Sequence, residues 1–268
     1  FPPFLLYYVV GCICEVLKKS FIGCQFDKGV WDDSSKSAAT LFISIGCKGK
    51  MVMAETSLNA DELAALRALD TPTVCNALEI CLPERRSFGF TTRQLHCVRP
   101  ELPPIVGYAR TITVRALRPS SDGPDVQREK RASYYNYVAT APGPTVSVVQ
   151  DLDGEQAGFG CFWGEVNTNV HKALGCIGTI TNGGVRDLPD FAEGFQALAG
   201  AVTPSHANIH VVDVGGEVNV AGMIVKSGDL VHGDVHGAVV IPHEVANDVP
   251  AAAALMVRRE AVVLAAAK

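Results

Sequence analysis

A regular pattern of apolar and polar positions begins near Met51 and first predicts two short helices. Asn59 and Glu62 have the spacing of a capping box, in which each side chain binds the backbone of the other residue. Leucines then recur at helical spacing, at Leu63, Leu66 and Leu69. Thr71-Pro72 predicts the start of the second helix, with Thr71 as its N-cap and Pro72 in its first turn.

Short β-branched and apolar runs follow, and most are bounded by glycine or other turn residues. They predict strands over residues 105–117, 144–151, 176–181, 208–214, 217–225, 229–232 and 237–241. Gly-Gly at 215–216 and Ser-Gly-Asp at 227–229 supply turns between the later strands. The spacing of these runs predicts a strand-rich middle region.

Helical segments are interspersed with these strands. The polar stretch 119–133 predicts a surface loop that leads into a short helix, and residues 164–174 predict the long helix of the middle region. An alanine-rich helix is expected from about residue 243 to 267, where Pro250 starts a new turn or kinks the helix. Helices at both ends of a strand-rich middle predict an α/β fold or a layered β/β/α fold.

Residues 1–50 do not share this pattern. Segment 4–17 is apolar but short for a bilayer span, and it lacks the basic flank and cleavage site of a signal peptide. We interpret residues 1–50 as a non-native or over-extended leader, with a targeting peptide as the alternative. Residues 51–268 are then expected to form the catalytic domain.

Composition and charge narrow the class of protein. Of the 268 residues, 48% are hydrophobic and 19% charged, which is typical of a globular chain and excludes a disordered one. A net charge of −5 and the lack of a Lys/Arg stripe argue against a nucleic-acid partner. The nine cysteines show no disulfide or zinc-finger spacing, so we expect reduced thiols in a cytoplasmic protein without a membrane partner.

The segment 158–190 carries the most chemical information. Glu165 lies in the first turn of the predicted helix that starts at Gly164, and Arg186-Asp187 follow the apolar run 176–181. Free backbone N–H groups at 164–167, which include Val166 and Asn167, would form an anion site. Arg186 could bind a carboxylate through its planar fork, and Asp187 could bind Mg²⁺. Taken singly, these residues are also typical of surface ion pairs and helix-dipole partners.

Two blocks of this chain resemble the RraA-like, class II pyruvate aldolase family, which includes the 4-hydroxy-4-methyl-2-oxoglutarate aldolases. In the first, Glu165 is followed by the twenty residues 166–185, then by Arg186-Asp187 and by Asp190. The second is the stretch from Gly228 to Pro242. The resemblance spans roughly residues 56–265. Glu165 departs from the aspartate of characterised aldolases, and Asn182-Gly183 replaces the usual Asp-Gly, which leaves the substrate open.

The resemblance implies a swivelling β/β/α domain assembled as a homotrimer or homohexamer. It implies retro-aldol cleavage or decarboxylation of a 4-hydroxy-2-oxo or 2-oxo diacid, including oxaloacetate, to pyruvate. Mg²⁺ or Mn²⁺ would bind Asp187, Arg186 and the amides of 164–167 would hold the small 2-oxo acid, and Glu165 would transfer a proton through water. Some relatives that lack the acidic residue instead regulate a ribonuclease without catalysis, and Glu165 argues against that alternative here.

Other polar side chains offer weaker sites. His232, Asp234 and His236 alternate as on one strand face and could bind a metal, although Gly233 and Gly237 predict a turn there. His206 and His210 lie near the start of a predicted strand and are weaker candidates for a catalytic role. Cys161 and Cys176 flank the site, but no basic partner marks either as a nucleophile. The absence of G-x-G-x-x-G and Walker motifs removes support for a nucleotide-binding function.

Overall fold

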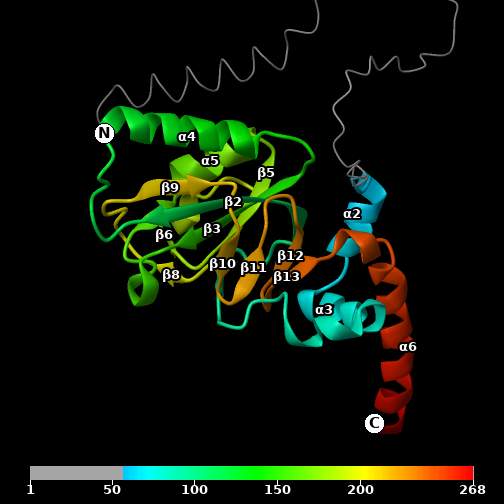
Figure 1. The fold of residues 1–268 in the computed structure, drawn as a ribbon. Coiled ribbons are helices and arrows are strands. Elements are labelled where there is room, and N and C mark those ends of the chain that lie inside the picture. Colours follow the sequence, from blue (N-terminus) through cyan, green and yellow to red (C-terminus); the bar gives the residue numbers. More distant parts are fainter. Residues whose placement is uncertain (1–56, 268) are drawn as a thin grey trace, which may run out of the picture. The chain divides into compact units, whose positions relative to one another are not determined.

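The computed structural model describes residues 57–267, which are built around an eight-stranded mixed sheet (Figure 1). Seven of its strands follow the order β1-β7-β5-β3-β2-β12-β13, and β9 pairs with β2. The parallel centre consists of β2 (Ile105–Arg115), β3 (Thr145–Asp151), β5 (Cys176–Thr181) and β7 (Gln196–Ala199). Antiparallel strands extend it: β1 (His96–Cys97), β9 (His210–Val214), β12 (Leu230–Asp234) and β13 (Gly237–Ile241).

Five short strands lie outside the main sheet. β10 (Val218–Val220) and β11 (Met223–Val225) form an antiparallel hairpin. The other three form a small parallel sheet in the order β4-β6-β8: β4 (Cys161–Trp163), β6 (Gly184–Val185) and β8 (Ala201–Val202). This small sheet lies at the carboxyl ends of β5 and β7, because β6 and β8 follow those strands within a few residues.

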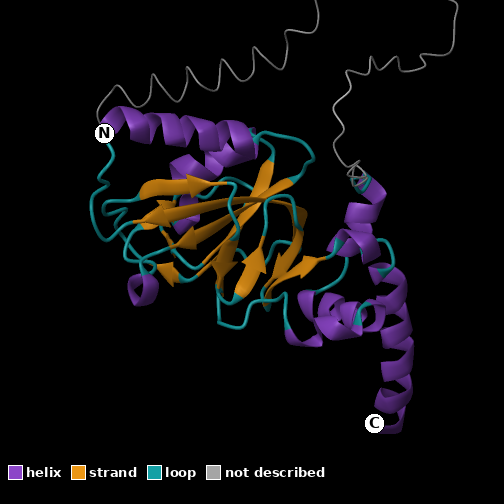
Figure 2. Ribbon diagram, viewed as in Figure 1, coloured by secondary structure: helices purple, strands orange, loops and turns teal. Residues whose placement is uncertain are grey.

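Helices cover the strands on separate sides, as the colouring by secondary structure shows (Figure 2). The α-helices are α2 (Ala60–Arg67), α3 (Thr71–Cys81), α4 (Pro124–Val138), α5 (Glu165–Ala173) and α6 (Val249–Ala267). Four 3₁₀ turns complete the set: η1 (Pro83–Ser87), η2 (Gly154–Gln156), η3 (Leu188–Asp190) and η4 (His243–Val245). The arrangement is the α/β fold with flanking helices that the sequence predicts.

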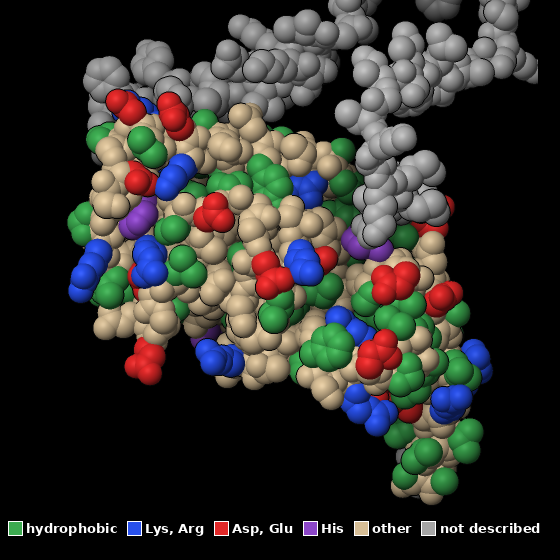
Figure 3. All heavy atoms as spheres, in the orientation of Figure 1, with side chains coloured by type: hydrophobic (Ala, Val, Ile, Leu, Met, Phe, Trp, Pro, Cys, Tyr) green, Lys and Arg blue, Asp and Glu red, His purple; other side chains and the backbone are tan. Residues whose placement is uncertain are grey.

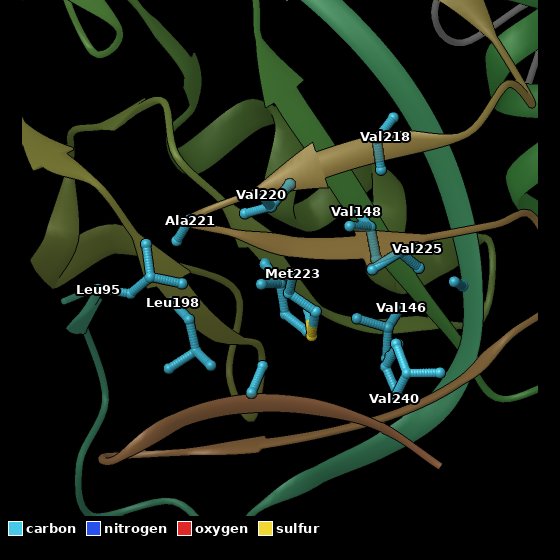
Figure 4. Close-up of a cluster of buried hydrophobic side chains, with 14 of the residues drawn as sticks. Leu95, Val146, Val148, Leu198, Val218, Val220, Ala221, Met223, Val225 and Val240 are labelled. Atoms are coloured by element: carbon cyan, nitrogen blue, oxygen red, sulfur yellow. The ribbon is translucent and has the colours of Figure 1, made fainter. Parts of the chain in front are cut away.

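Three apolar cores hold these layers together. The first lies between the main sheet and the β10–β11 hairpin, where Met223 faces Val146 and Val240 (Figure 4). The second joins the main sheet to α4 and to β4 and β6 of the small sheet, and the third joins β2, β12 and β13 to α2, α3 and α6. Burial of apolar area is the main favourable term in folding, so each layer is fixed by its own core.

The beginning of α3 corrects one prediction. Its N-cap is Asp70, whose side chain accepts a hydrogen bond from Thr73 N at 2.8 Å, and Thr71 is the first helical residue. Thr71 N instead donates to the buried Asp234 carboxylate at 2.9 Å. The capping box of Asn59 and Glu62 on α2 is present as predicted.

Two element boundaries also differ from the sequence pattern. The predicted strand 217–225 is the β10–β11 hairpin, because Ala221 and Gly222 both adopt positive φ and reverse the chain. Within the stretch 119–133, helix begins at Pro124 and continues to Val138, so α4 is longer than the short helix expected. Pro250 lies in the first turn of α6, where a proline is tolerated.

The predicted leader, residues 1–50, lies outside the described residues. Over residues 57–267, none of the helices is both long enough and apolar enough to cross a membrane. Helix α6 carries several exposed apolar side chains, namely Val257, Val262, Val263 and Leu264. The surface view shows hydrophobic side chains on this helix near the C-terminus (Figure 3).

Candidate functional site

The small parallel sheet brings the two halves of the predicted site together. In β4 and β6, Cys161 pairs with Gly184 and Trp163 with Val185, and Arg186 N donates to Trp163 O at 3.1 Å. Helix α5 starts directly after β4, and the Arg186-Asp187 pair follows directly after β6. Arg186 and Asp187 therefore directly follow β6. The sequence pattern instead predicts them after the strand 176–181, which is β5.

Gly164 allows a close approach between these two segments. It is the N-cap of α5, and Asp187 Oδ2 lies 3.4 Å from Glu165 N in the next residue. A Cβ atom on Gly164 would lie 2.6 Å from the same oxygen, which is closer than real Cβ atoms come to their neighbours. A glycine is therefore required if the Asp187 carboxylate is to stay where it is.

Asp187 has a backbone conformation that few residues adopt. Its φ of 56° and ψ of 38° lie in the left-handed region, which costs a non-glycine residue free energy. Backbone strain of this kind is concentrated at functional sites. Arg186 Nε lies 3.4 Å from Asp187 Oδ2, and the side chains are 29% and 40% exposed, so both remain accessible to a ligand.

The first turn of α5 presents unpaired donors. Gly164 provides no capping side chain, and Thr168 N already donates to Gly164 O at 3.1 Å. Among the described residues, Val166 N and Asn167 N have no acceptor. Unpaired N–H groups at the start of a helix favour an anion. The Arg186 guanidinium, which contacts Asp187, adds a positive charge beside this turn.

The two acidic side chains of the site, Glu165 and Asp187, differ in the contacts that their carboxylates make. Glu165 is exposed on the first turn of α5, and its carboxylate accepts no hydrogen bond from the described residues. Asp187 uses Oδ2 for its contacts with Glu165 N and Arg186 Nε. Its Oδ1 is left without a partner in the described part of the chain, so it can serve as a ligand for a hard cation.

A cation here would rely on few protein ligands. Residues 57–267 contain no group of three or more His, Cys, Asp or Glu side chains arranged to hold a metal. One carboxylate supplemented by substrate oxygens and waters is, however, the usual way in which Mg²⁺ is bound. The half-exposed Asp187 carboxylate fits that mode of binding.

His232, Asp234 and His236, which the sequence pattern offers as metal ligands, make contacts within the protein that have a structural role. His232 is buried, Thr71 Oγ1 lies 3.0 Å from its Nδ1, and Leu69 O lies 3.0 Å from its Nε2. Asp234 accepts from Thr71 N and from His236 N, the latter at 2.9 Å. These contacts tie the start of α3 to the main sheet.

The remaining candidates lie in local contacts. His206 Nδ1 and His210 Nδ1 each contact a nearby backbone oxygen, of Ala207 and Asn208. Burial raises the pKa of the Cys161 thiol, and it raises the pKa of Cys176 to about 11. Because the thiolate is the nucleophile, a raised pKa disfavours either cysteine in nucleophilic catalysis.

One cleft was not predicted from the sequence. It has a volume of about 620 Å³ and is lined in part by Asp151 and Asn182, at the carboxyl ends of β3 and β5. Asn182 accepts from Asp151 N at 2.8 Å and donates to Asp151 O at 2.9 Å. The Asn182-Gly183 turn is therefore a bridge between two strands, and the only hint of it in the sequence is an amide directly after a strand.

Comparisons with known proteins agree with this fold. An uncharacterized protein of Methanocaldococcus jannaschii is 31% identical over 99 residues, which are 36% of this chain and 48% of that protein. The chain thus spans about half the length of the curated relative it matches. This relative has no described activity to compare.

Solved structures show the same fold at low sequence identity. Streptomyces coelicolor RraAS2, described as an unusual member of the RNase ES inhibitor RraA family, has a TM-score of 0.60 at 22% identity, covering 78% of this chain and 98% of that one. An uncharacterized protein from Pseudomonas syringae has a TM-score of 0.59 at 20% identity, covering 79% and 94%. At these identities the likeness concerns the fold.

The family itself is shown by sequence. A family model described as RraA-like, Aldolase/RraA, matches residues 71–240, which is more than half of the 268 residues. The matched range contains the whole first block of the resemblance, with Glu165 and Arg186-Asp187. It contains the second block as far as Val240. The chain therefore belongs to the RraA-like family of aldolases and RraA proteins.

Proposed function

We propose that this chain is a divalent-cation-dependent lyase that cleaves a 4-hydroxy-2-oxo diacid to pyruvate, with oxaloacetate decarboxylation as a possible second activity. The observation that carries the proposal is the meeting of free α5 N–H groups, the Arg186 guanidinium and the Asp187 carboxylate at the edge of one small sheet. Donors and a hard oxygen ligand side by side suit a substrate with a carboxylate next to a carbonyl.

Binding of the 2-oxo acid would use the donors. The N–H groups of Val166 and Asn167 would hold one substrate carboxylate, and the Arg186 guanidinium would bind it from the other side and neutralise negative charge that develops during cleavage. Substrate oxygens would thus be oriented toward Asp187, the residue that would hold Mg²⁺ or Mn²⁺. When bound, the cation would supply Lewis-acid polarisation of the 2-oxo group.

Proton transfer would be the task of Glu165. In the cleavage direction, a base accepts the proton of the 4-hydroxyl group while the bond between C3 and C4 breaks. The second carbonyl compound leaves, the bond's electrons remain on the pyruvate part as an enolate, and protonation at C3 gives pyruvate. Glu165 is exposed on the first turn of α5, so a water can relay the proton between its carboxylate and the substrate.

The competing hypothesis is a non-catalytic regulator that binds a ribonuclease. Release of pyruvate from a panel of 4-hydroxy-2-oxo and 2-oxo diacids, with and without Mg²⁺ or Mn²⁺, separates the two functions. Cation-dependent release would support the lyase and identify its preferred substrate. A protein that stays inactive on the whole panel, yet inhibits a ribonuclease, would overturn the proposal.

We further propose that the active form is a homotrimer or homohexamer in the cytoplasm, as the resemblance implies. Light scattering on the purified protein gives the mass of the assembly directly. A monomer that retains full activity would contradict this part of the proposal.

A further inference from the structure

The side chain of Asn167 turns away from the candidate ligand site. Its Nδ2 donates to Phe162 O on β4, and its Oδ1 accepts the hydroxyl of Tyr135 on α4 at 3.1 Å. The amide thereby ties the first turn of α5 to a strand on one side and to another helix on the other. Only the backbone N–H of Asn167 is left for a ligand, which narrows the role that the sequence predicts for this residue.

His171 holds the same residue from one turn further along α5. Its Nδ1 lies 2.6 Å from Asn167 O, and a carbonyl oxygen can only accept, so Nδ1 carries the proton. Nε2 then accepts from the Tyr134 hydroxyl at 2.8 Å. Tyr134 Oη in turn accepts from Ser147 Oγ at 2.6 Å. The chain of hydrogen bonds thus runs from β3 through α4 to the first turn of α5.

This network is dry and uncharged. His171, Tyr134 and Ser147 are each 0% exposed. Burial lowers the pKa of His171 to about 4, so the imidazole stays neutral at physiological pH and keeps the tautomer that donates to Asn167. A buried network whose polar atoms are satisfied is rigid and holds one arrangement of its members.

Helices α2 to α5 begin in two ways: α2 and α3 have a capping side chain, whereas α4 and α5 follow a glycine and have none. Asn59 caps α2 and accepts from Asp61 N and Glu62 N, and Asp70 caps α3. Gly164 gives α5 no such acceptor. A capping side chain would occupy the N–H groups that the proposed site offers to a substrate. The contacts of Asn167 with Phe162, Tyr135 and His171 can hold the first turn of α5 without using those N–H groups.

We propose that Asn167, Tyr135 and His171 are positioning residues that hold the N–H groups of Val166 and Asn167 in register with Arg186 for the substrate carboxylate. The inference rests on the proposed function, and it adds how the anion-binding half of the site is built. Without these contacts the uncapped turn frays, and each binding event bears the cost of ordering it again. Ligand affinity falls in consequence, while the chemical step on the bound substrate is little changed.

The test compares two tyrosine variants of the full chain. Tyr135→Phe removes the hydroxyl that donates to Asn167 Oδ1. Tyr137→Phe is the matched control on the same helix, because its hydroxyl contacts Ser227 and Thr111 instead. The measurements are the Kd of pyruvate by calorimetry at saturating Mg²⁺, the KM and kcat of pyruvate release, and the melting temperature.

Tyr135→Phe is expected to raise the Kd of pyruvate and the KM about 3- to 10-fold, the effect of one lost hydrogen bond, with kcat within about 2-fold of the parent. Tyr137→Phe should leave the Kd unchanged even where it lowers the melting temperature. An unchanged Kd in Tyr135→Phe, or an equal rise in both variants, overturns the positioning role.

A second pair of variants changes charge instead of a hydroxyl. Asn167→Asp keeps an acceptor for Tyr135 but loses the donor to Phe162 O and places a negative charge beside the anion site. Asn169→Asp makes the same charge change at an exposed position two residues along α5, and it likewise loses one amide donor, the one to Glu165 O. Only Asn167→Asp is expected to weaken pyruvate binding by 10-fold or more, since it adds repulsion to the lost contact. Equal effects of the two variants would contradict the inference.

Failure of the parent protein to bind or release pyruvate would instead overturn the proposed function, and this inference with it.

Discussion

Asp187 Oδ2 lies 3.4 Å from the backbone nitrogen of Glu165, a residue 22 positions earlier in the chain. The two segments meet because β4 and β6 are parallel neighbours and end at the same edge of their sheet. A carboxylate beside a helix N-terminus is stabilised by the helix dipole. Asp187 is therefore positioned to hold a cation beside the first turn of α5.

The close approach at Gly164 gives the first prediction. Gly164→Ala places a Cβ 2.6 Å from Asp187 Oδ2, so the carboxylate has to move. We expect kcat/KM for pyruvate release to fall roughly 10²-fold, the effect of a displacement near 1 Å in an active site.

Gly123→Ala is the matched control for this variant. Gly123 is also the N-cap of a helix, and a Cβ there meets nothing within 4 Å. Comparable losses of kcat/KM in the two variants would contradict the importance of the contact between Gly164 and Asp187.

A second prediction concerns the cation. Asp187→Asn should abolish pyruvate release, because the amide oxygen is a poor substitute for a charged ligand of Mg²⁺. Asparagine tolerates the left-handed backbone of this position, so the melting temperature should change little.

The parent protein should lose activity in excess chelator and recover it with Mg²⁺ or Mn²⁺. Asp213→Asn, at an exposed position on β9 and outside both blocks of the resemblance, is the control and should remain active. Full activity of the parent in chelator would rule out the proposed role of Asp187.

Arg186→Lys tests how the carboxylate is held. Lysine keeps the positive charge but loses the planar fork that makes two parallel hydrogen bonds. We expect KM to rise roughly 10-fold, which is typical for a lost hydrogen bond to a charged group. Arg115→Lys, which alters the ion pair between the half-exposed Arg115 and the buried Asp153 side chain, should leave KM unchanged. An unaltered KM in Arg186→Lys would assign Arg186 to structure alone.

Glu165→Gln separates proton transfer from binding. The amide cannot accept the proton, so kcat should fall by roughly 10²–10⁴, the usual contribution of a general acid–base group. The Kd of pyruvate should change little, and Glu165→Asp should retain more activity because a water can bridge the shorter side chain. Both constants are measured at saturating Mg²⁺. A parental kcat in Glu165→Gln would reduce Glu165 to a helix-dipole partner and favour the regulatory function.

The longer strands could be predicted from the sequence because their apolar runs have clear ends. β5 and β13 have the predicted bounds of residues 176–181 and 237–241, with Gly175 just before β5 and Pro242 just after β13. Strands with long uninterrupted apolar runs are buried on both faces, and that pattern is visible without any knowledge of their neighbours.

The small sheet beneath the candidate site could not be predicted in this way. β6 and β8 have two residues each and β4 has three, which is too short for any periodicity. Their pairing joins residues that lie 17 to 23 positions apart, such as Cys161 with Gly184 and Gly184 with Ala201. The residues of the candidate site were therefore predicted from the sequence pattern, whereas the short strands that bring them together are seen only in the structure.

The prediction of Thr71 as the N-cap of α3 was wrong for a related reason. Asp70 and Thr71 are both good capping residues and are adjacent, so the local sequence does not choose between them. The choice is made by Asp234, which is 163 residues away and takes the Thr71 N–H. The inward turn of the Asn167 side chain likewise depends on Tyr135, a residue of another helix.

Stability below neutral pH gives the last prediction. Burial lowers the pKa of His171 from 6.5 to about 4 in the folded protein. The unfolded chain therefore binds a proton near pH 6.5, where the folded protein does not. The stability linked to His171 is fully present above pH 6.5 and is lost as the pH falls to about 4, with a maximum loss of about 3 kcal/mol.

His171→Gln should remove this dependence. The variant is expected to be less stable at pH 7, because the buried ring and its contact with Tyr134 are lost. Its free energy of unfolding should, however, fall less than that of the parent between pH 6.5 and 4. Burial also lowers the pKa of His232, and that contribution remains in both proteins and cancels in the comparison. Urea unfolding at a series of pH values measures both curves, and parallel curves would show that His171 does not titrate differently on folding.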